Sequence, residues 1–122
     1  MQIEKITENG VEIAHVTADG VLITDAQTAV DLMMTVKYEA GTKNIILAKE
    51  LLADKFFILS SGLAGEILQK FVNYGFRIAI YGDYSSYTSK PLKAFIYESN
   101  KGNDVFFTDD VKSAAAKLTR SI

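Results

Sequence analysis

A chain of 122 residues with 48% apolar and 23% charged side chains has the length and composition of one folded domain, which excludes a disordered tail. Thirteen basic and fifteen acidic residues give a net charge of −2, and neither sign forms a long block, so binding along a nucleic-acid backbone is not expected. Cysteine is absent, which excludes disulfides, thiolate nucleophiles and sulfur-ligand metal sites.

The ends and the apolar runs of the chain bear on its location. The N-terminus lacks the basic and apolar stretches of a secretory signal. No apolar run approaches the roughly 20 residues that are needed to span a bilayer. We therefore expect a single cytoplasmic domain over residues 1–122, with no membrane contact.

The first part of the chain predicts a β-hairpin followed by a helix. Residues 2–8 and 11–17 flank Asn9-Gly10, a pair typical of a type I′ turn. The apolar residues 21–23 predict a further short strand. Thr24-Asp25-Ala26-Gln27 then predicts a helix start in which Thr24 and Gln27 form a capping box. Gly41 is expected to end that helix in the left-handed conformation.

The remainder predicts strands that alternate with helices. Residues 44–48 and 76–81 are continuous apolar runs, as in strands covered on both faces. Ser60-Ser61-Gly62 and Ser89-Lys90-Pro91 are start signals for a second and a third helix. Residues 104–107 predict a last strand, and Thr108-Asp109-Asp110 caps a fourth helix. We expect an α/β fold with four helices on a mixed, mostly parallel sheet that opens with the hairpin.

Candidate binding residues gather at the carboxyl edge of this sheet, where the strand-to-helix loops of α/β proteins hold ligands and partners. We expect the 59–62 and 82–90 loops to face one another there across adjacent strands. The candidates at this edge are Thr24 and Asp25, then Ser60, Ser61 and Gly62, and then Asp83, Tyr84, Ser85, Tyr87, Ser89 and Lys90.

Each group has a functional and a structural interpretation. The 60–62 segment is either a phosphoacceptor or anion site at a helix N-terminus, or an N-cap serine and a glycine turn. The 82–90 loop either binds a ligand through its charges and tyrosines, or satisfies its own turn amides. Glu98, Asn100 and Lys101 form a second candidate surface, although a helix C-terminus also explains them.

The sequence contains no self-sufficient catalytic apparatus. His15 is the only histidine, so we expect a surface or cross-strand residue rather than a metal ligand. Phosphate-loop and dinucleotide signatures are missing, and no cofactor is expected. Asp83 is the one candidate for an acid or base, and whether the protein is an enzyme stays open, with the balance against it.

Leu59-Ser60-Ser61-Gly62-Leu63-Ala64 resembles the D-S-S-G-L-G motif of STAS domains, the fold of bacterial anti-sigma-factor antagonists. The resemblance implies a STAS-like fold in which a strand leads into the motif. It also implies that Ser61 can be phosphorylated by a partner kinase. The family's aspartate is Leu59 here, and Ala64 replaces its last glycine. The whole chain also resembles a bacterial family of unknown function, through the stretches 62–71, 82–84 and 95–100.

These features predict a non-enzymatic regulatory or protein-interaction module that acts through the strand C-terminal loops, with a phosphoserine-type switch at Ser61. The alternative is a small-molecule-binding protein or minimal enzyme with its site between the 59–62 and 82–90 loops. A protein partner is expected first, and a homodimer is compatible with the sequence.

Overall fold

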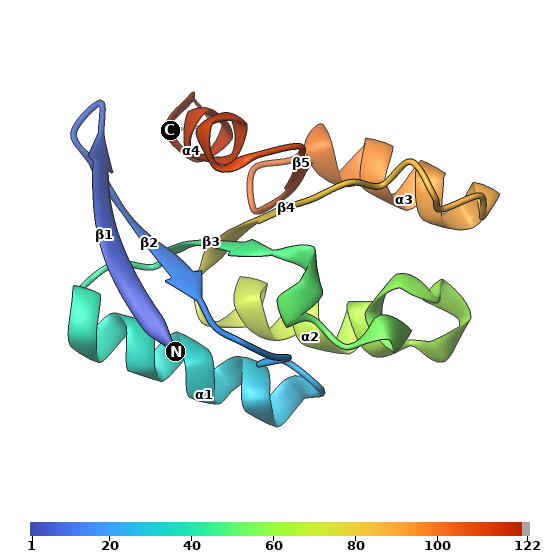
Figure 1. Ribbon diagram of the computed structural model, residues 1–122, viewed down its shortest axis with the longest axis horizontal. Helices are drawn as coiled ribbons and strands as arrows, with labels where there is room; N and C mark the ends of the chain where they lie inside the picture. Colours follow the sequence, from blue (N-terminus) through green and yellow to red (C-terminus); the bar gives the residue numbers. More distant parts are fainter. Residues whose placement is uncertain (121–122) are drawn as a thin grey trace.

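Five strands form one sheet in the computed structural model, which describes residues 1–120 (Figure 1). The strands lie in the order β1-β2-β3-β4-β5; the first pair is antiparallel and the others are parallel. This confirms the predicted α/β fold with its opening hairpin and four helices. The elements are β1 (Gln2–Glu8), β2 (Val11–Thr17), α1 (Ala26–Ala40), β3 (Asn44–Ala48), α2 (Leu63–Asn73), β4 (Arg77–Tyr81), α3 (Lys90–Asn100), β5 (Val105–Thr108) and α4 (Val111–Arg120).

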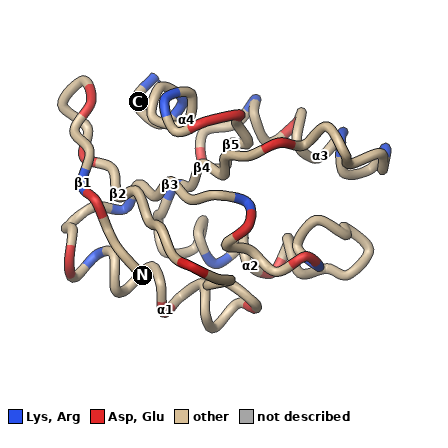
Figure 2. The backbone as a smooth tube through the Cα atoms, viewed as in Figure 1, with Lys and Arg blue, Asp and Glu red and all other residues tan. Residues whose placement is uncertain are grey.

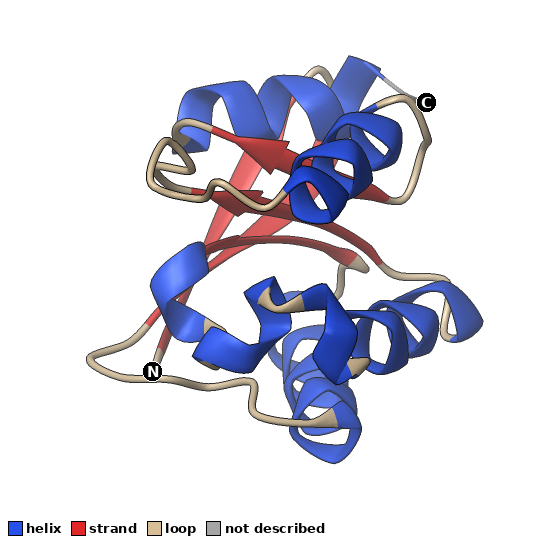
Figure 3. Cartoon of the chain, turned by 90° about the vertical axis from the view of Figure 1, so that its right-hand side faces the viewer, coloured by secondary structure: helices blue, strands red, loops and turns tan. Residues whose placement is uncertain are grey.

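The helices divide the core into two layers on either side of the sheet (Figure 3). Helices α1 and α2 cover one face, α4 lies on the other, and α3 packs beside β5 at the edge. Successive strand residues point to opposite faces of the sheet, and helices cover both faces, so each central strand is buried on both sides. Ile45 and Leu47 pack toward α1 and α2, whereas Ile46 packs toward α4.

The hairpin and the start of α1 depend on local turn chemistry. Asn9 and Gly10 both have positive φ, 51° and 79°, as a type I′ turn requires. The predicted cap of α1 is wrong by one residue. Asp25 is the N-cap, and its side chain accepts from the Thr28 amide while the Thr28 hydroxyl accepts from the Asp25 amide. Aspartate and threonine therefore form the capping box that Thr24 and Gln27 were predicted to form.

Two segments predicted or implied to be strands are irregular. Residues 21–23 contribute only one isolated bridge, between Ile23 and Leu52. The STAS resemblance implies a strand that ends at Leu59, but the chain between β3 and α2 folds into three 3-10 turns. Phe56 and Phe57 are buried in this segment, so apolar residues reach the core here without joining the sheet.

None of the helices within residues 1–120 combines the length and the apolar character needed to cross a membrane.

Candidate functional site

A shallow hollow of about 590 Å³ lies at the N-terminus of α2, beside the 3-10 turns. It brings together Thr24, Ser60 and Ser61, three of the residues that the sequence singles out. Its other lining residues are Lys55, Ile58, Leu63 and Glu66. The hollow therefore has an apolar part, a set of hydroxyls and two opposite charges at its rim.

The two serines of this hollow have different roles. The Ser61 hydroxyl donates to the Lys55 carbonyl at 2.7 Å and accepts from the Leu63 amide at 3.2 Å. Ser61 is exposed, but its hydroxyl holds the turn before α2 together. Within residues 1–120, the Ser60 hydroxyl makes no hydrogen bond, and the residue is exposed. Gly62, with a φ of 78°, is the N-cap and provides no side chain for capping.

Aromatic stacking separates the 82–90 loop from this hollow. The Tyr87 ring stacks on Phe57 at a centroid distance of 5.2 Å, and Tyr84 contacts both rings. The Tyr84 hydroxyl donates to the Ile80 carbonyl at 2.7 Å. The two tyrosines thus attach the loop to the 3-10 segment and fill the space between them.

The polar residues of the 82–90 loop serve turns and a helix start. Asp83 accepts from the Ser85 amide at 2.9 Å, and hydrogen bonding from the Ser85 side chain and amide holds the pKa of the Asp83 carboxyl below its usual value. A lowered pKa makes this carboxylate a weaker base, which disfavours an acid or base role for Asp83. Ser89 is the N-cap of α3 and accepts from Leu92, while Lys90 is exposed in the first turn.

The second candidate surface, at the end of α3, contains a contact that closes the sheet edge. Asn100 accepts from the Phe107 amide at 2.7 Å and donates to the Phe107 carbonyl at 3.1 Å. Its side chain therefore takes the place of a neighbouring strand along β5. Glu98 and Lys101 form an exposed ion pair at 3.7 Å, and Lys101 also lies over the Tyr97 ring.

One polar cluster was missed by the sequence analysis. His15 Nε2 lies 3.0 Å from the Tyr81 hydroxyl, and Nδ1 lies 4.0 Å from a carboxylate oxygen of Glu4. The cross-strand position of His15, opposite Glu4, agrees with the expectation. Its contact with Tyr81 joins strands that are not neighbours. The signal that could have found it is alternation, because His15 follows the buried Ile13 by two residues and Tyr81 follows the buried Ala79 by two.

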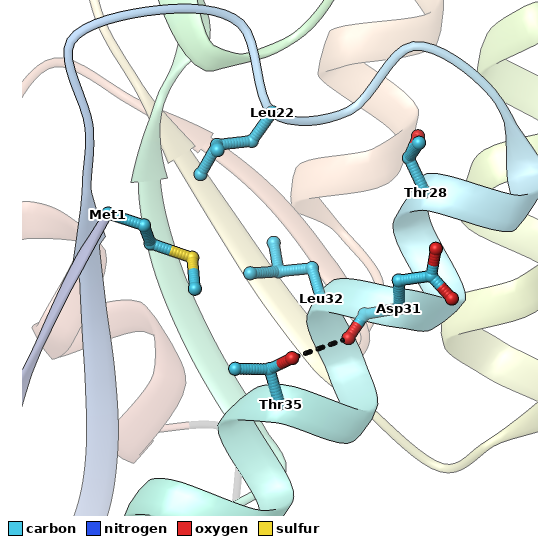
Figure 4. A pocket seen from close by; sticks show the side chains of 6 residues that line it. All are labelled: Met1, Leu22, Thr28, Asp31, Leu32 and Thr35. Atoms are coloured by element: carbon cyan, nitrogen blue, oxygen red, sulfur yellow. Dashed lines mark hydrogen bonds between the residues drawn. The ribbon is translucent and has the colours of Figure 1, made fainter.

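A further hollow, of about 200 Å³, lies between the N-terminus and α1 (Figure 4). Its polar side chains are already engaged: Thr28 belongs to the capping box, and Thr35 donates to the Asp31 carbonyl at 2.9 Å. Asp31 accepts from Gln27. The remaining lining is apolar, from Met1, Leu22 and Leu32. This hollow therefore offers few free polar groups to orient a ligand.

Charges of both signs are interspersed along the chain (Figure 2). In the part of the chain that the structure describes, no three histidine, aspartate or glutamate side chains gather into a group that could hold a metal ion.

Comparison with known protein families gives one match. The family model described as Domain of unknown function (DUF4180) matches residues 8–118, which is nearly the whole chain. None of the curated proteins matches the sequence.

Proposed function

The chain belongs to the DUF4180 family, and we propose that it is a protein-interaction module whose contact surface is the hollow at the N-terminus of α2. The observation that carries the proposal is the exposure of Ile58. Its side chain is 53% exposed at the edge of the hollow, although the two residues before it are buried. An apolar side chain held outward in this way supplies the kind of contact that the core of a protein interface buries.

The partner that fits this surface is a protein segment with an apolar side chain at its centre and charges of both signs around it. Ile58 and Leu63 offer apolar contact, and Ser60 offers an unused hydroxyl. Lys55 and Glu66 form no ion pair within residues 1–120, so both are available to opposite charges on the partner. Such rim charges set specificity and association rate more than affinity.

A phosphoserine-type switch belongs to this proposal, and the hydrogen bonds favour Ser60 over Ser61 as its residue. A phosphate on Ser61 would remove the proton that its hydroxyl donates to the Lys55 carbonyl. A phosphate on Ser60 would leave those bonds intact. Beside the α2 N-terminus the added charge is tolerated by the fold, but in an apolar interface it must be desolvated. An unpaired interface charge costs several kcal/mol, enough to abolish a micromolar contact.

The test is capture of binding partners from an extract of the source organism, quantified by mass spectrometry. The baits are wild type, Ile58→Asp, Ser60→Asp and the control Val72→Asp, whose residue is 47% exposed on α2 and outside the hollow. We expect a protein that wild type and Val72→Asp retain and that both hollow variants lose. Equal retention by all four baits would refute the proposal.

The alternative site between the 59–62 and 82–90 loops has less support. The Phe57 ring packs against Tyr84 and Tyr87 where the two loops meet, and the Asp83 carboxylate accepts a hydrogen bond from Ser85 within its own turn.

A further inference from the structure

The His15 cluster lies on the sheet face that α4 only partly covers. Helix α4 packs against Ile13, Ile46, Ala79 and Phe106, and its C-terminal end lies beside the hairpin turn at Glu8 and Asn9. Figure 1 shows α4 near that turn and away from the N-terminal end of β1. The carboxyl end of β2 therefore lies beyond the helix. His15 and Thr17 point to this uncovered part.

The contact between His15 and Tyr81 crosses a whole strand. β3 lies between β2 and β4, and the residue of β3 opposite Tyr81 is Ala48. The small alanine leaves room for the phenol to pass over β3 and reach the imidazole, where the rings meet edge to face at 5.7 Å. This fixes the plane of the His15 ring, whose side chain is only 15% exposed.

The other edge of the ring borders a hollow of about 480 Å³ lined by Gln2, Ile3, Glu4, His15 and Thr17. Nδ1 and the Glu4 carboxylate oxygen are 4.0 Å apart, which is too far for a direct hydrogen bond in either tautomer. Burial lowers the pKa of His15, partly offset by Glu4, which favours the neutral form of the ring. When Nε2 donates to Tyr81, Nδ1 is an acceptor, and two acceptors then face the same space.

We propose that this hollow binds a primary alkylammonium group, with its nitrogen between His15 Nδ1 and the Glu4 carboxylate. A nitrogen about 2.8 Å from both atoms spans the 4.0 Å separation with an angle of about 90° at the nitrogen, and bent charge-assisted hydrogen bonds of this kind need no movement of the protein. A tetrahedral zinc ion bound at about 2.0–2.1 Å would need that angle to open from about 110° to about 150° or more, so it fits less well. The Gln2 amide and the Thr17 hydroxyl line the same hollow and can accept further N–H groups.

The sole histidine makes the test direct, because its imidazole nitrogens give one set of NMR signals. Butylamine, charged at pH 7, is titrated into the full chain while the His15 nitrogens are observed. We expect a saturable shift of Nδ1 that butanol does not produce. Glu4→Gln should weaken binding about tenfold, the usual loss for a hydrogen bond to a charged group. Glu12→Gln is the matched control, since Glu12 is on the same hairpin but pairs with Lys5 and does not line the hollow.

Tyr81 is a positioning residue here, and its removal has a separate readout. Tyr81→Phe keeps the ring but removes the hydroxyl at Nε2, so the tautomer ratio of His15 should change along with the affinity. A lysine-containing tetrapeptide compared with butylamine distinguishes the two sources of the group. Tighter binding of the peptide indicates a protein side chain, and equal binding indicates a free amine.

Three outcomes would overturn the assignment: no shift of Nδ1 with butylamine, equal affinities for wild type and Glu4→Gln, or displacement of the amine by zinc chloride at lower concentration.

Discussion

Lys49 lies flat against Gly82, so closely that a β-carbon at position 82 would come 2.7 Å from Lys49 Cγ and 2.8 Å from Cδ. The same side chain continues to Tyr87, where Nζ is 3.3 Å from the hydroxyl oxygen and 4.9 Å from the ring centroid. Lys49, which directly follows β3, therefore packs against the loop that follows β4. This contact and the φ of 157° at Gly82, which L side chains rarely adopt, together favour glycine at the first position of that loop.

Gly82→Ala should destabilise the protein by about 1–3 kcal/mol, because the new methyl group overlaps the middle of the lysine chain rather than its flexible end. Urea denaturation measures this change. In the Lys49→Ala background the same substitution should cost less, since the overlapping atoms are gone. Gly65→Ala is the matched control: position 65 is inside α2 with open space around it, so alanine should stabilise by about 0.5–1 kcal/mol. An equal loss at 82 in both backgrounds would contradict the contact.

Asn100→Ala should expose the edge of β5. Both hydrogen bonds to Phe107 are lost, and leaving partly buried backbone groups unpaired costs about 1–3 kcal/mol. Hydrogen exchange at the Phe107 amide should accelerate in the variant. The control is Asn73→Ala, which removes only an exposed contact with Gln69 and should leave that exchange rate unchanged. Unaltered protection of Phe107 in Asn100→Ala would show that the side chain does not close this edge.

The stability of the protein should fall in alkaline solution because of Tyr84. Burial raises the pKa of this phenol well above its ordinary value of 10.0. Above pH 10 the phenol of the unfolded chain loses its proton while that of the folded chain keeps it. The free energy of unfolding therefore decreases as pH rises. Urea midpoints measured from pH 9 upward should decline less steeply in Tyr84→Phe than in wild type. Tyr38→Phe, at a residue that is 91% exposed, should follow the wild-type slope.

Ser61→Ala and Ser60→Ala should separate the two serines by stability alone. Ser61→Ala removes two hydrogen bonds that fix the turn before α2, so a loss of about 0.5–1.5 kcal/mol is expected in thermal or urea denaturation. Ser60→Ala removes none within the described residues and should remain within about 0.5 kcal/mol of wild type. The reverse order would contradict the roles assigned to the two hydroxyls.

The fold was predictable from the sequence because its signals are local. Asn9-Gly10 favours a type I′ turn, which needs positive φ at both central residues. The continuous apolar runs of β3 and β4 indicate strands that are packed against other elements on both faces. The segment from Lys49 to Ser61 was not predictable in detail. Phe56 and Phe57 resemble strand residues in sequence but lie in a 3-10 turn, where Phe57 packs against Tyr84 and Tyr87 from a later loop.

The candidate site was predictable only in part, because it also depends on contacts between residues that are distant in sequence. Serine before an apolar helix marks the N-terminus of α2. The sequence does not reveal that Ser61 donates to the Lys55 carbonyl, whereas Ser60 makes no side-chain hydrogen bond within residues 1–120. Nor does it reveal that Tyr81 reaches His15 across β3, because that contact depends on sheet order and on the small residue at position 48.

The most direct test of the proposed interaction surface is photo-crosslinking in living cells of the source organism. A photoreactive amino acid is placed at position 58, at the edge of the hollow, or at position 72, an exposed apolar position outside it. We predict that position 58 gives a discrete protein adduct that Ser60→Asp abolishes and Ser60→Ala preserves, and that position 72 gives none. An adduct at 72 and none at 58, or an adduct at 58 that persists in Ser60→Asp, would contradict the proposed surface and its switch.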